Sequence, residues 1–588
     1  MTEYFEVLDR DGAARVGELG LAEPRHTPGL IGDALQDAGS LWADEREVPS
    51  GSDSELTLLP HRAFPPGTPG SVQDELDVSA PDIDGPSAAV ISQESVEDRG
   101  TDAYILSTPG PLIGHARAFV ETIIEIRRSI PDDTALLFSG VATPANVGLL
   151  AYAGVDIVDT DRAVVAGTRG RYLEPTEESF LEDRSELSCT CPACQGPRSE
   201  FTTEDCIEHN VAALSAELAR VRERIRSGRL RDYLEGQARH HPWMTAALRR
   251  FDQEGAFLKE RAPLFRRSEL AATTDDSLFR PAVTRFADRV ETRYANRFED
   301  VPLLLVPCSA GKPYSDSQSH RQFQEAARYR AHKVSLTAPL GVVPQELELT
   351  YPAQHYDAAV THDWSETEIS VIADRLGNLL DATEYDRVIA HVSPGGEQEI
   401  VEQALAERDL PVTFTVENHP TAGNSLAALG EALEGERTIQ VEAKERASLR
   451  AIADYQFGPG AGDAILPEFE LQGRYPRLQA LAPDGEQLAA LVPQYGTLAL
   501  TLAGARQWVE STVRTSRVEI DAFRPHGSVL APGIVDADES IRVGDEVVFE
   551  GPEAFGIGRA SMHGAAMIES TRGEAIDVRH VTDSAADR

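Results

Sequence analysis

Short apolar runs alternate with amphipathic stretches in the first third of the chain, and this alternation predicts a parallel α/β arrangement. The runs that fit buried strands are 103–106, 135–138 and 155–159, and the stretches with helical spacing between them are 113–129 and 144–153. Strands that alternate with helices are typical of a parallel sheet or barrel.

A second alternating region begins near residue 301. Its candidate strands are 303–306, 334–337, 387–392 and 412–416, with helical stretches between them. Past about residue 445, turn dipeptides separate short apolar runs, which predicts two small β-containing modules at the C-terminus. Residues 46–100, by contrast, are rich in Ser, Pro, Gly, Asp and Glu and have no clear apolar period, so we expect loop or loosely ordered chain there.

The composition changes how partners are inferred. Acidic residues outnumber basic ones by 97 to 55, and the net charge is −42 over 588 residues. Arginine has almost wholly replaced lysine, as in organisms with a molar-salt cytoplasm, so solvation in brine explains the acidity better than a specific acidic function. Because the Debye length is roughly 3 Å at 1 M salt, the charge does not exclude a nucleic-acid partner.

Targeting and cysteine signals are sparse. The sequence starts without an apolar signal-peptide region, and no run approaches the roughly 18 apolar residues of a membrane helix. The few cysteines are clustered, which favours metal ligation in a reducing compartment over disulfides. We therefore expect a soluble cytoplasmic protein with no membrane partner.

Cys189, Cys191 and Cys194 form a C-x-C-x₂-C run, and His209 follows fifteen residues after the last of them. Three thiolates and one imidazole fill a tetrahedral zinc shell and leave no position for water, so the predicted site is structural, with one zinc per chain. Cys206 lies three residues before His209 on the same expected helical face. It could replace His209 or lie beside the ligands.

The segment 307–320 is the strongest candidate for chemistry. It reads Pro307-Cys308-Ser309-Ala310-Gly311-Lys312-Pro313-Tyr314, then Ser317 and His320, and it follows an apolar run. Ligand sites in α/β proteins lie past the carboxyl ends of strands, so we predict an active-site loop. The chain keeps only four lysines and five cysteines, and one of each, Lys312 and Cys308, stands here.

A cysteine in such a loop is a candidate nucleophile, and Lys312 and His320 could lower its pKa or transfer protons. The alternative is a small buried residue at a strand end. Loops beginning at Pro339 and Pro394 follow strands of the same region, so the three loops are expected to share a pocket. The sequence leaves open whether three further histidines, His355, His362 and His391, line this pocket.

The N-terminal half resembles the tRNA-guanine transglycosylase family of zinc-containing TIM barrels. The resemblance rests on residues 5–7, 11–15, 27–28, 138–140 and 154–159, on the cysteine run and on His209-Asn210. In that family the zinc histidine is followed by Asn, which favours His209 over Cys206. Asp159 matches the family's nucleophilic aspartate, yet the base-binding Asp-Ser-Gly-Gly-Phe-Gln segment is missing between residues 40 and 130. Asp159 is then either catalytic or a polar residue ending a strand.

The segment 307–320 resembles the signature of the archaeosine synthase branch of this superfamily, and the composition resembles haloarchaeal proteins. Residues 512–583 resemble an RNA-binding PUA domain, and residues 446–511 resemble the small domain that precedes it. The resemblance implies a multidomain α/β chain with four parts. These are a degenerate TIM-barrel-like transglycosylase domain with a zinc site over 1–270, a central α/β domain over 271–445, a small α+β domain over 446–511 and a β-barrel PUA domain over 512–588.

The resemblance also implies the reaction. Members of this branch act on tRNA that carries 7-cyano-7-deazaguanine at position 15 of the D-loop, and they convert its nitrile toward an amidine with lysine or glutamine as amino donor. With lysine, a radical-SAM partner protein must cleave the adduct. The residues expected in catalysis are Cys308, Lys312, Tyr314, Ser317 and His320, with Asp159 as a further candidate.

Two other functions stay open at this point. The chain could be a transglycosylase that inserts the base through Asp159, or a non-catalytic subunit that presents tRNA to another enzyme. The sequence leaves the oligomeric state open as well, a homodimer included.

Overall fold

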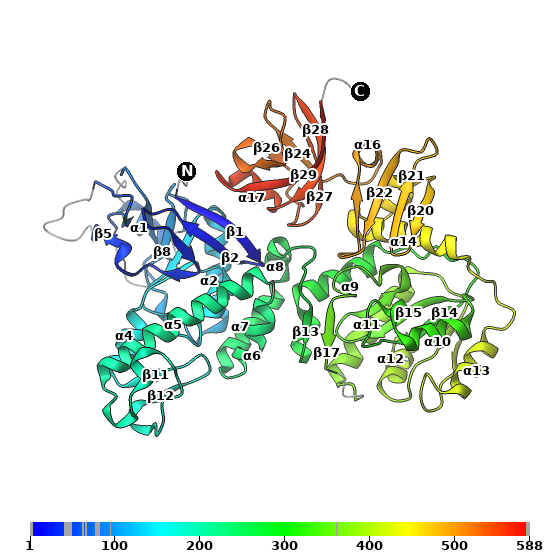
Figure 1. Cartoon of the computed structure of the whole chain (residues 1–588), viewed down its shortest axis with the longest axis horizontal. Coiled ribbons are helices and arrows are strands. Elements are labelled where there is room, and N and C mark those ends of the chain that lie inside the picture. Colours follow the sequence, from blue (N-terminus) through cyan, green and yellow to red (C-terminus); the bar gives the residue numbers. More distant parts are fainter. Residues whose placement is uncertain are drawn as a thin grey trace. The chain divides into compact units, whose positions relative to one another are not determined.

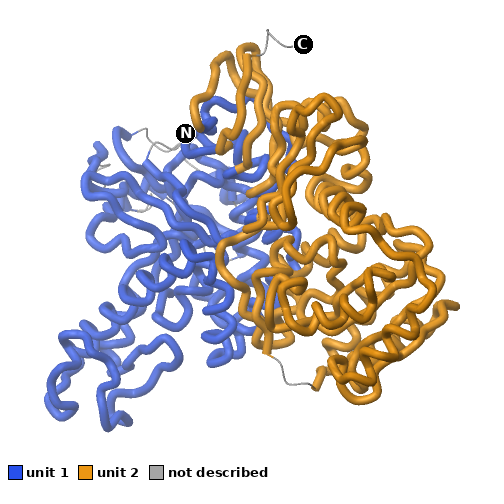
Figure 2. The backbone as a smooth tube through the Cα atoms, turned by 45° about the vertical axis from the view of Figure 1, so that its right-hand side comes forward, with its two compact units in different colours: residues 1–263, 528–543, 561–575 blue, residues 264–527, 544–560, 576–588 orange. Residues whose placement is uncertain are grey.

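The computed structural model describes residues 4–39, 50–61, 64, 67–76, 83–93, 96–359 and 363–583. The chain divides into two compact units (Figure 2). Unit 1 comprises residues 1–263, 528–543 and 561–575, and unit 2 comprises residues 264–527, 544–560 and 576–588. No helix in the described ranges is long and apolar enough to cross a membrane.

Unit 1 is built on a seven-stranded parallel sheet (Figure 1). In spatial order its strands are β4 (Gly29–Leu30), β10 (Ile157–Val158), β9 (Ala135–Phe138), β8 (Ala103–Leu106), β7 (Ser87–Ile91), β6 (Leu56–Leu58) and β5 (Leu35–Asp37). Helices α2 (Ala116–Ser129) and α3 (Val147–Ala153) alternate with the later strands, as the apolar pattern predicts, and α4 (Asp161–Thr168) follows the last of them. A separate antiparallel sheet joins β1 (Phe5–Asp11), β2 (Ala14–Leu19) and β3 (Arg25–Thr27).

The parallel sheet is curled. Strands β4 and β5 are its opposite edges, yet only residues 31–34 separate them along the chain. That link spans at most about 18 Å, whereas a flat sheet of seven strands would measure about 29 Å from its first strand to its last. The sheet must therefore bend until its edges approach one another, which confirms the barrel-like prediction.

The prediction of loop over residues 46–100 is wrong for three segments. Strands β6 and β7 and the short helix α1 (Gly70–Glu75) lie in this range. Strand β6 has only three residues, Leu-Thr-Leu, and three residues are too few to establish a period. Other parts of the range, among them 77–82, lie outside the described residues.

A helical region completes the first part of unit 1. It contains α5 (Thr203–Arg226), α6 (Leu230–Ala238), α7 (Pro242–Gln253) and α8 (Gly255–Arg261), and the hairpin β11 (Arg171–Leu173) and β12 (Glu178–Phe180) precedes it. Apolar residues at helical spacing on α5, such as Leu214, Leu218 and Val221, are buried in the core between α5 and the barrel.

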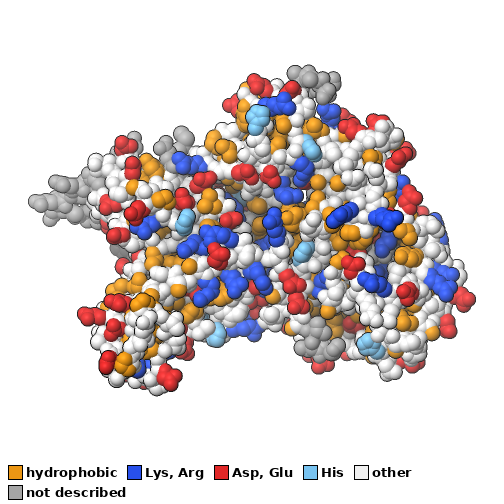
Figure 3. Space-filling model, viewed as in Figure 1, with side chains coloured by type: hydrophobic (Ala, Val, Ile, Leu, Met, Phe, Trp, Pro, Cys, Tyr) orange, Lys and Arg blue, Asp and Glu red, His pale blue; other side chains and the backbone are white. Residues whose placement is uncertain are grey.

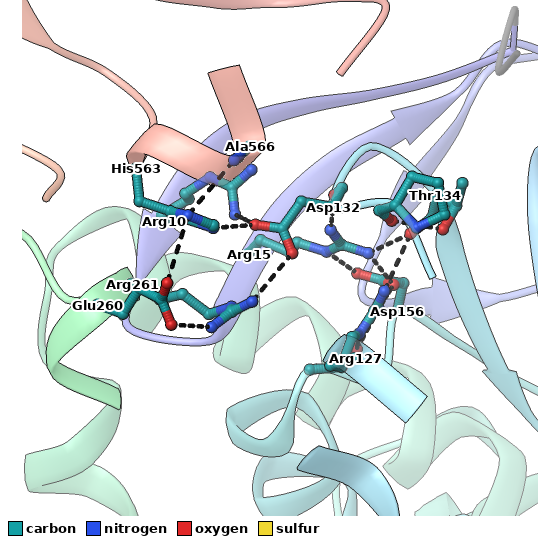
Figure 4. A network of polar contacts seen from close by, with 12 residues as sticks. Arg10, Arg15, Arg127, Asp132, Thr134, Asp156, Glu260, Arg261, His563 and Ala566 are labelled. Carbon is teal, nitrogen blue, oxygen red and sulfur yellow. Dashed lines mark hydrogen bonds and ion pairs between the residues drawn. The ribbon is translucent and has the colours of Figure 1, made fainter. Parts of the chain in front are cut away.

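A buried charge network ties the barrel together (Figure 4). Asp156, just before β10, accepts hydrogen bonds from Arg15 Nε and Nη2 at 2.8 Å each, from Arg127 and from the Leu136 backbone N–H. Burial works to raise the pKa of Asp156, but the charges of Arg15 and Arg127 outweigh it and hold the pKa below its usual value. One carboxylate thus links β2, α2, β9 and β10.

A C-terminal segment of the chain joins the same unit. His563 Nε2 lies 2.5 Å from an oxygen of the buried Asp132, and the Thr571 N–H donates to Asp133 at 2.6 Å. Arg10 and Arg261 also face Asp132, at 3.7 and 3.5 Å (Figure 4). The segment carries β25 (Ser528–Leu530), β26 (Ile534–Ala537) and α17 (Gly564–Glu569).

Unit 2 centres on a five-stranded sheet. Its order is β16 (Gly341–Pro344), β15 (His332–Thr337), β14 (Leu303–Pro307), β18 (Val388–Ala390) and β19 (Val412–Phe414), parallel except for the β15–β16 pair. The four strands predicted for this region are confirmed as β14, β15, β18 and β19. Helices α9 (Pro281–Arg293), α10 (Gln318–Ala327), α11 (Glu366–Ala382), α12 (Gly396–Leu405) and α13 (Gly423–Ala432) accompany it, and β13 (Leu270–Ala272) pairs with β17 (Tyr356–Ala358) beside it.

The rest of unit 2 is strand-rich, as the turn-punctuated sequence predicts. Helices α14 (Val441–Phe457) and α15 (Ala461–Ile465) precede an antiparallel sheet of β20 (Glu470–Arg474), β21 (Arg477–Leu481), β22 (Gln487–Val492) and β23 (Thr497–Leu500). Helix α16 (Leu502–Glu510) follows, then β24 (Arg517–Ile520), β27 (Glu546–Glu550), β28 (Ala554–Ala560) and most of β29 (Glu574–Asp583).

On the face shown in Figure 3, acidic side chains are scattered rather than gathered in one patch.

We expect Asp156→Ala to lower the free energy of unfolding of unit 1 by about 3–5 kcal/mol, because it leaves two buried guanidinium groups without their carboxylate. Denaturant unfolding in molar potassium chloride measures this. Since the folded pKa of Asp156 is depressed, its contribution is present above the unfolded carboxyl pKa and is lost as the pH falls through the folded value.

The matched control is Glu121→Ala, which removes the carboxylate that pairs with the exposed Arg117 on α2 and with the partly exposed Arg250 on α7. An exposed pair of this kind contributes at most about 1 kcal/mol. Equal small losses for both variants would contradict the role assigned to the Asp156 network.

Candidate active site and metal site

The register of β14 against its neighbours places Cys308. The Cys308 N–H donates to the Leu336 carbonyl at 3.0 Å, which continues the parallel β14–β15 ladder one residue past the strand. On its other side β14 pairs with β18. Cys308 therefore stands at the carboxyl end of the central strand, where α/β sheets bind ligands.

A cavity of about 340 Å³ opens at this end of the sheet. Its lining comes from β17, from the loops after β14, β15, β17, β18 and β19, and from the first turns of α11 and α12. It comprises Cys308, Ser309, Ala310, Lys312, Ala338, Tyr356, Asp357, Ala358, Ala359, Asp363, Trp364, Glu368, Ser393, Pro394, Gly396, Glu397, Asn418 and His419. The loops at 338 and 394 thus share a cavity with the Cys308 loop, as predicted.

Cys308 and Lys312 of the predicted loop both line this cavity. Burial raises the pKa of the Cys308 thiol; the Thr337 hydroxyl and the Lys312 charge oppose the rise, and the Glu397 charge adds to it. Lys312 lowers this pKa, as expected, but burial outweighs it. Burial also lowers the pKa of Lys312 below its ordinary value, so thiol and amine are brought closer to an exchange of one proton.

Tyr314, Ser317 and His320 lie behind the cavity rather than in its lining. The Ser317 hydroxyl caps α10 by accepting from the His320 N–H at 3.3 Å. The His320 ring stacks on Tyr314, with centroids 5.0 Å apart, and its Nε2 lies 3.0 Å from the Pro307 carbonyl. Burial lowers the pKa of His320 to about 3, so the ring is neutral and donates to that carbonyl. These residues hold the strand end that precedes Cys308.

Of the three further histidines, the two that the structure describes, His355 and His391, do not belong to the lining. His391 is buried and contacts the Thr415 hydroxyl and the Pro420 carbonyl, both at 2.8 Å. His355 lies outside the lining, and His362 lies outside the described residues. The histidine that does line the cavity is His419, which the sequence analysis missed together with Tyr356 and Trp364.

In unit 1, Cys189, Cys191, Cys194 and His209 form a group that could hold a metal ion. Their ligand atoms all lie within 4.8 Å of one another. Sulfur atoms around a tetrahedral zinc with bonds of about 2.3 Å lie about 3.8 Å apart, so the spacing suits a four-coordinate site. Burial raises the pKa of Cys194 to about 12, and a bound cation would compensate for deprotonating such thiols.

The tautomer of His209 is set by its neighbour. Nε2 lies 3.0 Å from the Leu173 carbonyl and donates to it, which leaves Nδ1 facing the sulfur atoms of Cys191 and Cys194 at 3.6 and 3.4 Å. Cys206 instead directs its sulfur at the Arg171 carbonyl, 3.4 Å away, and is not one of the four.

Asp159 lies in unit 1, at the carboxyl end of β10. Its carboxylate accepts from the Ser139 hydroxyl, from the Gly140 N–H at 3.0 Å and from the Asp161 N–H at 3.2 Å. A cavity of about 360 Å³ at these strand ends is lined by Gly140, Arg162 and Trp243 among others, but not by Asp159. The carboxylate therefore joins the loops after β9 and β10.

Comparison with protein families assigns each part of the chain. Residues 87–243 match the queuine tRNA-ribosyltransferase model, and residues 283–433, which include the Cys308 cavity, match a domain of unknown function (DUF5591). Residues 447–514 match the patch-forming domain C2 of tRNA-guanine transglycosylase, and residues 515–582 match the PUA domain.

Whole-chain comparison decides the family. The chain is 56% identical to a protein of Haloferax volcanii named archaeosine synthase, over 99% of this chain and all of the relative. The chain belongs to the archaeosine synthase family. Within this family it is also 40% identical to the archaeosine synthase subunit alpha of Methanosarcina acetivorans, over 99% of this chain and all of that one. A tRNA-guanine(15) transglycosylase of Methanothermobacter thermautotrophicus is 25% identical over 79% of this chain and 68% of its own length.

We expect this family member to carry about one metal ion per chain, and Cys191→Ala to abolish metal binding and lower the melting temperature, because a closed four-ligand site contributes folding free energy. Elemental analysis and thermal unfolding measure the two effects. The control is Cys206→Ala, which removes a buried sulfur outside the four ligands and should retain the metal. A full metal complement in the Cys191 variant would rule out the assignment.

Proposed function

We propose that this chain adds an amine to the nitrile of 7-cyano-7-deazaguanine at position 15 of tRNA and so forms an amidine or its lysine adduct. The observation that carries the proposal is that Cys308 and Lys312 enter the same cavity at the carboxyl ends of β14 and β15. The name archaeosine synthase, borne by relatives that match nearly the whole chain, supports it.

The chemistry needs no oxidant or reductant. The Cys308 thiolate adds to the nitrile carbon, and the nitrile nitrogen takes up a proton to give a thioimidate. The amine of the donor then adds to the same carbon, the carbon–sulfur bond breaks, and an amidine forms as the thiolate is released. The sum is nitrile plus amine, with every atom retained.

Lys312 is the proton carrier that fits these steps. Its lowered pKa lets a fraction of the amine accept the Cys308 proton, and the resulting ammonium can protonate the imidate nitrogen. Tyr314, Ser317 and His320 act through the loop that they support and not through contact with the reacting atoms. Direct amine attack on the nitrile is the alternative if Cys308 is not needed.

The cavity favours a cationic amine as donor. Asp357, Asp363, Glu368 and Glu397 line it, and among the described residues of the lining Lys312 is the one lysine or arginine. Both candidate donors carry an α-ammonium group, but lysine carries a second positive charge, so lysine fits better than glutamine. A lysine adduct would require a radical-SAM partner to release the amidine, and the name subunit alpha of the Methanosarcina relative is consistent with a partner protein.

The other modules would bind tRNA. We infer that the PUA region, the preceding small domain and the transglycosylase-like barrel dock tRNA. The domain boundaries lie at residues 270, 445 and 511, and the Cys₃His group holds a structural zinc.

Asp159 is engaged by three donors from its own loops, which disfavours the base-exchange alternative. The Cys308 cavity disfavours a purely presenting subunit. Cytoplasmic location fits a tRNA-modifying enzyme, and a homodimer remains compatible with the proposal.

Cys308→Ser should reduce product formation to background while metal content and tRNA affinity stay normal, because a serine alkoxide is far scarcer than a thiolate. The assay is incubation with cyano-deazaguanine tRNA and lysine, glutamine or ammonium, followed by nucleoside mass spectrometry. Because burial raises the pKa of the thiol above its ordinary 9.0, the rate should rise with pH across the neutral range. A fully active serine variant would exclude covalent catalysis.

Lys312→Arg separates proton transfer from charge balance. Arginine keeps the positive charge but does not release a proton near neutral pH, so we expect a loss of roughly two to four orders of magnitude if Lys312 transfers a proton. Lys259→Arg is the matched control, since it makes the same exchange on α8 outside the cavity and should leave the rate unchanged. Near-normal activity of the Lys312 variant would reduce its role to charge balance.

A further inference from the structure

Tyr356 contacts two residues of the predicted loop, Tyr314 and Lys312, but lies outside that loop. It begins β17, and its side chain is almost fully buried. The Tyr356 hydroxyl lies 2.6 Å from the Tyr314 hydroxyl and also bonds to the Thr337 hydroxyl. Its ring face lies under the Lys312 ammonium group, with Nζ 3.9 Å from the ring centroid.

We propose that Tyr356 is the positioning residue of the cavity: its ring face holds the Lys312 amine beside Cys308, and its hydroxyl bonds keep the ring in that place. The proposal rests on the proposed function of Cys308 and Lys312 and adds to it the group that locates the proton carrier. Tyr314, the tyrosine within the loop, presents its ring to His320 instead.

The hydroxyl contacts fix the ring from two elements. Thr337 ends β15, and its hydroxyl also lies 3.0 Å from the Ala338 carbonyl. The Thr337 hydroxyl bonds to the Tyr356 hydroxyl, which in turn bonds to the Tyr314 hydroxyl. This chain of three hydroxyls joins β15, β17 and the Cys308 loop, so a shift in any one of them would move the ring under Lys312.

The ring should act on the charge of Lys312. A cation over an aromatic face is stabilised relative to the neutral amine, most strongly where water is excluded. The other groups that face Lys312 are Cys308 at the end of β14, Asp357 on β17 and Glu269 before β13, and all three favour its charged form, whereas burial opposes it. The ring therefore helps to keep the amine protonated and ready to return a proton to the imidate nitrogen.

Because the chain has few lysines, the effect of the ring on the pKa of Lys312 can be measured without an activity assay. The chain has only Lys259, Lys312, Lys333 and Lys444, so the pH dependence of labelling by an amine-reactive reagent can be followed for each by peptide mass spectrometry. Only the neutral amine reacts, and the midpoint of labelling reports the pKa. The variants are Tyr356→Phe, which keeps the ring, and the same position carrying phenylalanine with increasing fluorination, which weakens the ring's attraction for cations at nearly constant size.

Tyr356→Phe removes the hydroxyl bonds that place the ring, so it should lower the Lys312 midpoint relative to the wild type, and full fluorination should lower it by roughly a further half to one and a half units. Lys333, whose pKa burial lowers to about 8, should not move. Tyr385→Phe is the matched control for loss of a buried tyrosine hydroxyl, because Tyr385 bonds to His332 and not to the cavity. A Lys312 midpoint that stays constant across the fluorinated series would overturn the proposal, as would an equal shift in Tyr385→Phe.

The rate of product formation by the same variants is the second measurement. If Tyr356 positions Lys312, the fluorinated series should lower the rate in step with the Lys312 midpoint and leave tRNA affinity unchanged. An active Cys308→Ser enzyme would overturn the covalent mechanism while the Lys312 titration could still support the role of Tyr356. A constant titration with an inactive Cys308→Ser enzyme would remove Tyr356 and retain the mechanism.

Discussion

The main-chain bond between the Cys308 N–H and the Leu336 carbonyl sets the geometry of the whole cavity. Because side chains alternate between the faces of a sheet, a slip of one residue in the β14–β15 register would turn each side chain of the strand end to the opposite face. The His320 bond to the Pro307 carbonyl and the Ser317 cap of α10 reinforce this position from behind. The chemistry proposed for the loop thus depends on backbone pairing, which Ser317 and His320 support.

Features that depend on local spacing could be predicted from the sequence. The metal group follows from cysteines within six residues plus a histidine on the next helix, and the strands of unit 2 follow from continuous apolar runs. Strands β6 and β7 could not be predicted, because they are short and stand among turn residues. Tyr356 and Trp364 could not be predicted either, since an aromatic residue 40 or more positions from Cys308 carries no local sign that the fold returns it to the same cavity.

Arginine and lysine occupy different kinds of position in this chain. Arginine serves the ion pairs of unit 1, where a fixed charge and a planar donor fork suit Asp156 and Asp132. Lysine is retained at Lys312 and Lys333, both withdrawn from solvent and both with lowered pKa values. A guanidinium could not lose its proton in either place, so the rare lysines mark positions where the charge must be adjustable or the space is narrow.

The bond between His563 and Asp132 has a consequence for how the chain is made. The two partners are 431 residues apart in the sequence. At a synthesis rate of about 5–20 residues per second, Asp132 emerges roughly 20–90 s before the histidine that will meet it. Throughout that interval Asp132 and Asp133 lack the contacts that His563 and Thr571 make with them in the complete fold, although Arg10, which faces Asp132, has already been made. Unit 1 can therefore fold completely only at the end of translation, because part of it lies close to the C-terminus of the chain.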